Sequence, residues 1–488
     1  MLNSPPTKTI LITGATGYIG RRLTQRLSEK ASFSLRLMVR NQNKVQISIT
    51  SKVDEIIEGD TFDKDSLKAA MQGVDTAFYL IHSMGAKGDY GHLDRESAEN
   101  FRNSCIAAGV RRIIYLGGLG VKQTASKHLL SRIETGEILS EESGKIQTIW
   151  LRAGVIIGSG SASFEIIRNL CQKLPIMITP RWVRTKTQPI GIEDVLSYLE
   201  RSIDVEHDGN LIVDIGTEPL NFQMMMKQAA EVMNLRRALI PVPVLSPRLS
   251  SYWLILFTPI PYKLASALVG GLKSETVLQN DHAKRFYPEI HPMDFKETVA
   301  FAHKELQTNQ VLSRWCDSSG QEACDIKDFD DPAGAIYRDV RIIPYNNGER
   351  AEDVFRAACG VGGPNGWFKY NVLWRLRGLL DKLAGGYGLN RGRRLHRELR
   401  IGDALDFWKV ADIKEGKRLL LYAQMKLPGE AWLEFDIQPQ QLVQTAHFIP
   451  RGLLGRLYWY VVLPFHYFVF PDLAKTVVRS SKDFAITA

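Results

Sequence analysis

Three glycines near the start of the chain have the spacing of a phosphate-binding turn. Residues 9–23 read TILITGATGYIGRRL, so that an apolar strand runs into Gly14, Gly17 and Gly20 and a helix begins directly behind them. Gly14 allows the tight turn, Gly17 lets the backbone approach a pyrophosphate, and Gly20 lets the helix pack on the sheet. The free N–H groups at the start of the helix would face the anion. This context favours dinucleotide binding over a merely structural turn.

A second candidate for chemistry is the pair His128 and Arg132, which are four residues apart and therefore share one face of the helix expected there. An imidazole with its ordinary pKa near 6.5 could act as a general acid. The guanidinium keeps its charge at any working pH, so it could hold a ribose but could not exchange a proton.

Strand-like and helix-like segments alternate over the first 120 residues. We expect strands at 34–39, 53–58, 75–80 and 112–116, and helices at 65–71 and 92–108. This alternation predicts an α/β fold with a parallel, doubly wound Rossmann sheet and right-handed crossovers. Ligands of such sheets bind beyond the carboxyl ends of the strands. The residues expected at that edge are Gly14, Arg40, Asp60, Ser83 and Gly117.

Arg40 follows the second strand, where the selectivity for the dinucleotide is set. An acidic residue at this place holds the ribose 2′-hydroxyl of NAD, whereas a basic one accommodates the 2′-phosphate of NADP. Arg40, with Arg21, Arg22 and Lys44 as helpers, therefore favours NADP(H), with NAD(H) as the alternative. The competing interpretation is that these are solvated charges.

Several motifs resemble the atypical and extended short-chain dehydrogenase/reductases, in particular the NmrA-like group. They are TGATGYIG, the GD after the third strand, RRIIYL, LRAGVIIGSGSASF and QPIGIEDV, and they span residues 8–305. More narrowly, YLIHSMG, YLGGLG, HLLSRIETGEIL and TPRWVRTKTQPI resemble a bacterial group that carries an appended C-terminal domain of unassigned function. That group is related to the reductase-like accessory subunit of respiratory complex I.

The resemblance implies roles for residues around the cofactor. The pyrophosphate would be lined by Gly14, Thr16, Gly17, Tyr18 and Gly20. Arg40 would hold the 2′-phosphate, Asp60 the adenine, and Ser83 would approach the nicotinamide side.

The chain departs from this family at the residues that transfer the proton. A working reductase has a serine after the fifth strand and a Tyr-x-x-x-Lys on the next helix. Here the strand ends at Gly117 and Gly118, and His128 stands in the tyrosine's region. Three interpretations stay open. His128 replaces the tyrosine and reduction is retained, the protein is a catalytically silent dinucleotide-binding sensor or assembly protein, or Arg132 and Glu134 form a surface pair beside His128.

The remaining chain suggests a division into domains. We expect a reductase domain at 8–310 with its substrate lobe at about 155–305, an acidic linker at 311–334 and a second domain at 335–488. Residues 241–272 are apolar and aromatic, which favours a hydrophobic carbonyl, quinone or lipid-like substrate.

The second domain is expected to be α+β, similar to helix-grip domains that enclose an apolar ligand. Alternating apolar residues predict strands at 395–400, 404–410, 418–425, 431–437 and 442–448, with helices at 367–383 and 453–480. A basic run (Arg391, Arg393, Arg394, Arg397 and Arg400) suits peripheral contact with an anionic membrane. A solvated strand-and-turn face is the alternative.

Net charge, cysteine content and apolar segments narrow the functional class of the protein. The 488 residues carry a net charge of +9 without a nucleic-acid-binding motif, so we expect no nucleic-acid partner. The five cysteines are scattered, which predicts no metal site and a reducing compartment. The first nine residues lack an apolar segment, so we expect no signal peptide and a cytoplasmic protein, peripheral at the inner face of the membrane. The apolar stretches 252–272 and 457–470 are too interrupted or too short for a span and are expected in a buried core, with a bilayer interface or a ligand cavity as alternatives.

Overall fold

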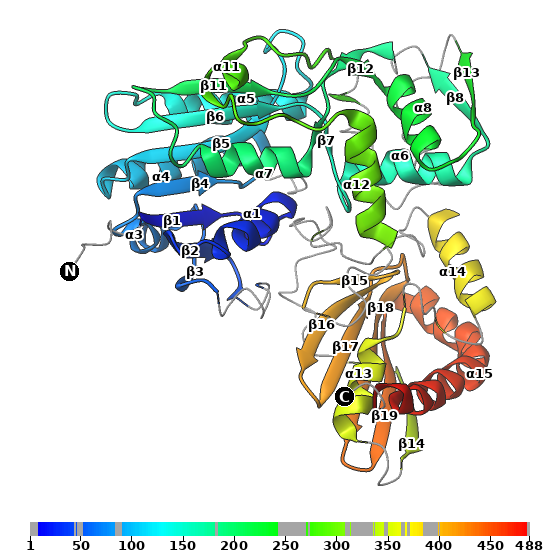
Figure 1. Cartoon of the computed structure of the whole chain (residues 1–488). Helices are drawn as coiled ribbons and strands as arrows, with labels where there is room; N and C mark the ends of the chain where they lie inside the picture. Colours follow the sequence, from blue (N-terminus) through cyan, green and yellow to red (C-terminus); the bar gives the residue numbers. More distant parts are fainter. Residues whose placement is uncertain are drawn as a thin grey trace. The chain divides into compact units, whose positions relative to one another are not determined.

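The chain forms two compact units, Met1–Gln321 and Glu322–Ala488 (Figure 1). The computed structural model describes residues 8–42, 45, 52–82, 90–180, 184–242, 270–271, 274–307, 313, 335, 337–345, 350–362, 367, 371–383, 399 and 401–485. Each unit is described by itself.

The first unit is built on a seven-stranded parallel sheet with the strand order β11-β6-β5-β4-β1-β2-β3. The strands are β1 (Lys8–Thr13), β2 (Phe33–Val39), β3 (Glu55–Glu58), β4 (Thr76–Tyr79), β5 (Arg112–Gly118), β6 (Gln147–Ala153) and β11 (Leu211–Ile215). The order reverses between β1 and β4, which is the place where open α/β sheets bind ligands. The predicted doubly wound Rossmann sheet is therefore confirmed.

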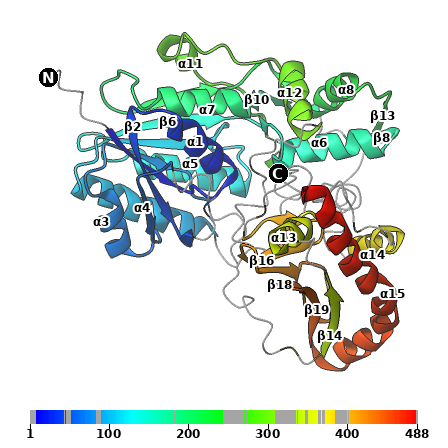
Figure 2. The ribbon, with the colours of Figure 1, turned by 60° about the horizontal axis from the view of Figure 1, so that its bottom comes forward.

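Helices cover both faces of this sheet (Figure 2). The helices α1 (Tyr18–Ser28) and α7 (Ile192–Arg201) pack on one face, and α3 (Lys64–Met71), α4 (Tyr90–Ala107) and α5 (Lys127–Ser140) pack on the other. Both faces of the strands are apolar for this reason. Ile10 and Ile12 of β1 belong to one core cluster, whereas Leu11 belongs to the opposite one.

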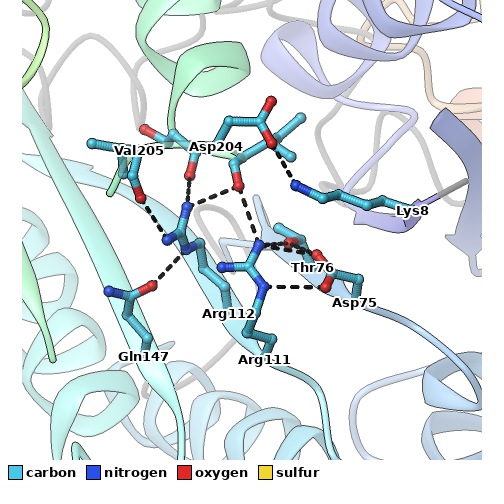
Figure 3. Close-up of polar contacts among 10 residues, drawn as sticks. Lys8, Asp75, Thr76, Arg111, Arg112, Gln147, Asp204 and Val205 are labelled. Carbon is cyan, nitrogen blue, oxygen red and sulfur yellow. Dashed lines mark hydrogen bonds and ion pairs between the residues drawn. The ribbon is translucent and has the colours of Figure 1, made fainter. Parts of the chain in front are cut away.

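Two neighbouring arginines close the amino end of the sheet (Figure 3). Arg112 is buried, and its guanidinium donates to the carbonyls of Ser202 (2.6 Å), Ile203 (2.8 Å) and Val205 (2.7 Å), which follow α7. Burial lowers the pKa of Arg112 to about 10. Arg111 lies nearer the surface and pairs with Asp75. The buried guanidinium of Arg112 thus fixes the chain after α7 to the start of β5.

A smaller lobe extends from this sheet. It holds α6 (Ala162–Lys173), α8 (Phe222–Val232) and α12 (Phe295–Gln307) around a separate apolar cluster. Three short two-stranded sheets complete it: β7 (Ile156–Ile157) with β10 (Ile190–Gly191), β8 (Ile176–Pro180) with β13 (Ala238–Val242), and β9 (Lys186–Thr187) with β12 (Leu220–Asn221). The short helix α11 (His282–Phe286) instead packs beside β11 of the main sheet, where the His282 Nδ1 lies 2.6 Å from the Ile212 carbonyl oxygen. Most of the apolar segment 241–272 lies outside the described residues.

The second unit is a six-stranded antiparallel sheet packed against helices, as expected for an α+β domain. The strand order is β14-β19-β18-β17-β16-β15. The strands are β14 (Tyr337–Pro344), β15 (Ala404–Leu405), β16 (Trp408–Lys414), β17 (Arg418–Ala423), β18 (Gly429–Gln438) and β19 (Gln441–Pro450). The helices are α13 (Ala351–Cys359), α14 (Asn371–Leu383) and α15 (Gly452–Ala485).

Three features of this unit refine the expectations. β14 was not expected, although its residues alternate between half-buried and exposed as an edge strand requires. The strand expected at 395–400 and the basic run from Arg391 to Arg400 lie outside the described residues, apart from Leu399. The closing helix α15 is longer than expected and carries Pro464 and Pro471 within it.

Candidate active site at the carboxyl edge of the sheet

The glycine turn after β1 has the geometry that only glycine allows at two positions. Gly14 has a φ of +68°, and a Cβ placed on it would lie 2.4 Å from the carbonyl oxygen of Leu80. A Cβ on Gly20 would lie 2.2 Å from the carbonyl oxygen of Gly14. The turn and the first helix therefore pack at backbone contact distance, which is the cradle that the spacing predicts.

The amino end of α1 follows this turn directly. Its N-cap is Gly17, which offers no side-chain cap to the first N–H groups of the helix. These N–H groups, beside Thr16, are the donors that a pyrophosphate would accept from. The Tyr18 hydroxyl donates to the carbonyl of Ser159 at 3.2 Å, and burial raises its pKa. Tyr18 thus serves packing through its ring and contributes to the turn through its backbone.

Two of the three arginines on α1, Arg21 and Arg22, are buried in the unit. Arg22 is buried and bonds to the Ser159 carbonyl and hydroxyl at 3.1 and 2.8 Å, facing Glu193 and Glu305. Arg22 is therefore engaged in holding the lobe to α1, and the expectation that it helps Arg40 is wrong. Arg21 is also buried, and Lys44 lies outside the described residues.

Arg40 and Asp60 lie at the same edge of the sheet as the glycine turn. Arg40 is exposed and comes directly after β2, two residues beyond Met38. Met38 is paired with Thr13 of β1 in the parallel register. Asp60 comes two residues after Glu58, the residue paired with Val39. Its carboxylate accepts from the N–H of Phe62 at 3.2 Å. Ser83 lies outside the described residues.

A chain of three side chains crosses the carboxyl ends of β4 and β5. His82 follows β4, Asp94 lies in α4, and His128 lies at the start of α5. The His82 Nε2 is 3.0 Å from the His128 Nδ1, and the His82 Nδ1 is 3.0 Å from the Asp94 Oδ2. Ser131 donates to the same Asp94 oxygen at 2.7 Å. Asp94 is 3% exposed, so a buried carboxylate anchors a relay of two imidazoles.

The donors and acceptors of these hydrogen bonds determine the tautomers of the two imidazoles. An ionised Asp94 only accepts, so His82 donates from Nδ1 and its Nε2 must accept. His128 then donates from Nδ1 to His82, which leaves the His128 Nε2 without a proton. In this neutral form His128 offers a base at Nε2, and one added proton converts the same atom into a hydrogen-bond donor.

The environment keeps the two imidazoles neutral at rest. Burial is the largest cause that lowers the pKa of His82, and the carboxylate of Asp94 opposes it. Burial, His82 and Arg132 together lower the pKa of His128 to about 2. The expectation of an imidazolium with an ordinary pKa near 6.5 is therefore wrong for His128.

Arg132 is held at the end of β5 rather than on the surface. Its guanidinium donates to the Leu116 carbonyl at 2.8 Å, and its own carbonyl accepts from the Tyr115 hydroxyl at 2.9 Å. Glu134 instead pairs with Arg95 at 3.1 Å. The third interpretation, a surface pair of Arg132 and Glu134, is wrong because each residue has another partner.

Residues 14–144 match a family model described as NAD(P)H-binding. The N-terminal unit carries an NAD(P)-binding domain. Residues 332–473 match a second model, described as "Protein of unknown function (DUF2867)". The NAD(P)-binding domain and the appended domain agree with the resemblance to NmrA-like atypical reductases drawn from the motifs.

Curated relatives of the NAD(P)-binding domain are distant. A (4-alkanoyl-5-oxo-2,5-dihydrofuran-3-yl)methyl phosphate reductase of Streptomyces griseus is 27% identical over 123 residues, which are 25% of this chain and 39% of that protein. An uncharacterised chloroplastic protein of Arabidopsis thaliana is 24% identical over 43% of this chain and 70% of its own length. The chain thus spans about two fifths of the length of the first relative.

Among solved structures, a triphenylmethane reductase of Citrobacter sp. superimposes with a TM-score of 0.50 and 20% identity. The match covers 60% of this chain and 99% of that chain. The NAD(P)-binding domain with its lobe therefore shares the fold of that structure.

The usual serine has no room in this NAD(P)-binding domain. A Cβ on Gly117 would lie 2.4 Å from the indole Nε1 of Trp150, and one on Gly118 would lie 2.6 Å from the Cδ1 of Leu129. Trp150 also lies against Gly136 of α5, where a Cβ would be 2.2 Å from its ring. The missing serine is thus part of how β5, β6 and α5 pack.

Sequence reasoning placed His128 and Arg132 in this site but missed His82 and Asp94. A signal existed for His82, because it directly follows the fourth strand and so falls at the ligand-binding edge. The sequence carries no such signal for Asp94, since an aspartate in the first turns of a helix is ordinary. Only the packing of α4 against α5 brings it to the histidines.

Proposed function

We propose that the N-terminal unit is an NADP(H)-dependent oxidoreductase that reduces a hydrophobic carbonyl, quinone or lipid-like substrate, with His128 as the proton-transferring group. The observation that carries the proposal is the Asp94–His82–His128 relay beside the glycine turn. A buried carboxylate that orients an imidazole is a recurring means of proton transfer in enzymes.

The chain's own residues would act on the oxygen of the substrate. NADPH held by the glycine turn and Arg40 would supply the hydride for the carbonyl carbon. As the carbonyl electron pair moves to oxygen, the His128 Nε2–H donates its proton there and an alcohol forms. Both imidazoles of the relay are then uncharged, the Nε2 is again a base, and it takes up the next proton from solvent. The reverse reaction uses the same atom to deprotonate the alcohol.

The carboxylate of Asp94 favours the proton that this step needs and acts against the burial that lowers the pKa of His128. An isolated imidazolium at this site is disfavoured because burial penalises its charge. Asp94 carries one negative charge, so the relay with one added proton is neutral overall. Arg132 holds the end of β5 beside the relay, and its position suits contact with the ribose.

The preference for NADP(H) is supported by Arg40, which is exposed at the carboxyl edge beside the glycine turn. We expect Arg40→Ala to weaken NADPH binding by about ten- to a hundredfold, the range for a lost charge-assisted bond, and to leave NADH binding within about twofold. Titration calorimetry with both nucleotides measures this. Arg201→Ala, at an exposed ion pair on α7, is the matched control. Equal losses for NADPH and NADH would remove Arg40 from the 2′-phosphate site.

A second candidate function is a dinucleotide-binding sensor or assembly protein without hydride chemistry. The observation that favours it is the low pKa of His128, which leaves the relay without the transferable proton at rest. The two functions share the cofactor site and differ in turnover.

The deciding experiment is titration of the purified full chain with NADPH and NADH, followed by NADPH oxidation with a panel of quinones and apolar aldehydes. Nucleotide binding with turnover supports the oxidoreductase. Binding without turnover on the whole panel supports the sensor. Absence of binding to either nucleotide contradicts both, because both depend on the glycine turn.

A further inference from the structure

The outer face of the first half of α15 is apolar. Six of its side chains are between 52% and 83% exposed and recur at spacings of three and four residues: Leu453, Leu454, Leu457, Val461, Phe465 and Phe468. This spacing aligns them in one stripe along the helix. The stripe ends within the helix, because Lys475 and Arg479 occupy the exposed positions further on. The expectation that residues 457–470 are buried core is therefore wrong for the outward-facing side chains.

The inner face of the same helix is fixed to the sheet of its own unit. Trp459 is buried and stacks on Phe448 of β19. His466 lies 3.4 Å from Asp339 of β14, and the Arg341 guanidinium lies 4.9 Å from the centre of the Tyr467 ring. One side of the helix is thus occupied by protein and the other is uncovered.

The neighbouring helix α14 widens this apolar surface. Val372, Leu376, Leu379 and Leu380 are each more than half exposed. Arg377 of α14 donates to the Tyr458 hydroxyl of α15, and its guanidinium lies 5.7 Å from that ring. This side-chain contact joins the two helices, which lie near each other in both views (Figures 1 and 2). We call the exposed apolar side chains of α14 and of the first half of α15 the apolar platform.

The exposed charges on the two helices of the platform are basic. Between Gly452 and Pro471 the sequence contains no acidic residue. Arg456 and Arg375 are exposed on the two helices, and Arg451 is exposed directly before α15, 3.7 Å from Glu430. Asp381 of α14 is buried and accepts from the Lys426 N–H. An apolar face rimmed by arginines and tyrosines complements an anionic bilayer surface.

We propose that the apolar platform docks on an anionic lipid bilayer, with α15 lying in the plane of the interface. By length and composition, Gly452–Ser481 is the one helix among the described residues that could cross a membrane. Its inner face, however, packs on the sheet, and spanning would surround that sheet with lipid. An amphipathic helix that inserts only its outer face keeps the sheet in water.

Flotation of the full chain with vesicles tests this proposal. Vesicles of phosphatidylcholine mixed with phosphatidylglycerol should carry the protein upward, and phosphatidylcholine alone should carry much less. Leu454→Asp and Val461→Asp should each lower the bound fraction by about tenfold or more, since each removes the burial of an apolar side chain. Arg456→Gln should lower it by about fivefold. Phe301→Asp, at an exposed apolar site on α12, is the matched control and should bind as the parent chain does.

Other occupants of the platform give different results. No flotation on anionic vesicles, or equal flotation of Leu454→Asp and the parent chain, overturns the proposal. A dimer in sedimentation that Leu454→Asp dissociates, without vesicle binding, assigns the platform to a second copy and overturns it as well. Resistance of the bound protein to extraction with alkaline carbonate would indicate a spanning helix and contradict the interfacial placement. Circular dichroism of each variant should match that of the parent chain, because the substituted side chains are exposed.

Discussion

His128 depends on two neighbours for its chemistry, because a lone buried imidazole would be neutral at physiological pH. The relay couples it through His82 to the carboxylate of Asp94, whose negative charge offsets the added proton. At the scale of single residues, the proposed oxidoreductase would use a carboxylate acting through two imidazole rings in place of the Tyr-x-x-x-Lys pair. Asp94 and His82 are positioning residues in this account.

We expect His128→Ala to lower the rate of NADPH-dependent turnover by about 10²- to 10⁴-fold, the usual contribution of a general acid. NADPH affinity should stay within about twofold of the parent value. The measurement is steady-state turnover with any accepted substrate from the panel, together with calorimetric titration. His92→Ala, on the exposed side of α4, is the control. Unchanged turnover in His128→Ala would exclude His128 as the acid.

The lowered pKa values also predict acid sensitivity. The pKa of His128 is about 2 in the folded chain and near 6.5 in the unfolded chain, so between these values the unfolded chain binds more protons. The free energy of unfolding is therefore not reduced by His128 above pH about 6.5, and it falls as the pH drops below that value because the unfolded chain takes up the proton. Between pH about 7 and 5, His128→Gln should show a shallower loss of unfolding free energy than the parent chain, by up to about 1.4 kcal/mol per pH unit. Urea unfolding at several pH values measures this, and an identical slope in both chains would contradict it.

The sequence revealed residues whose role depends on a single turn, but it did not reveal contacts between segments that are distant in the chain. The need for glycine at Gly14 follows from one turn, so the spacing revealed it. The contact of His82 with His128 joins residues 46 positions apart and depends on how α4 packs against α5. Arg22 was misassigned for the same reason, since its partners Ser159, Glu193 and Glu305 are distant in sequence.

At the scale of elements, hydrophobic periodicity was a reliable guide. A strand was expected at 112–116, and β5 runs from Arg112 to Gly118. β14 escaped notice because its apolar and polar residues do not alternate in the usual sense: Asp339 and Arg341 are half-buried, whereas Val340 and Ile342 are exposed. The outer face of α15 was misjudged because composition alone does not distinguish a buried helix from one with an uncovered apolar face.

The arginine pair at the amino end of the sheet gives a prediction for element packing. Arg112→Met should lower the free energy of unfolding by about 3 kcal/mol, because it leaves three carbonyls after α7 without their buried donor. Arg111→Met should cost about 1 kcal/mol or less, as expected of a surface ion pair. Chemical denaturation of both variants measures the difference. Equal losses would mean that buried Arg112 stabilises the fold no more than exposed Arg111 does (Figure 3).

At the scale of the whole molecule, the two units have separate apolar cores. The clusters around β1 and α6 contain residues of the first unit, and the cluster around β17 contains residues of the second. Each core therefore supports its own sheet. Any coupling between cofactor binding and membrane docking would have to pass between two independently packed bodies.

Calorimetric unfolding of the full chain should accordingly show two transitions. NADPH at about a hundred times its Kd should add about 2.7 kcal/mol to the unfolding free energy of the first unit alone. The transition of the second unit should not move. A single transition, or an equal shift of both, would contradict the independence of the two cores.

Trp150 also constrains how this site could have arisen. Its indole lies between Gly117 and Gly136, so a side chain at either glycine would meet a rigid aromatic ring. Reintroducing the serine at position 117 would first require a smaller residue at position 150, and that change alone would leave a cavity in a buried cluster. Packing alone therefore opposes a serine at position 117 unless position 150 changes with it.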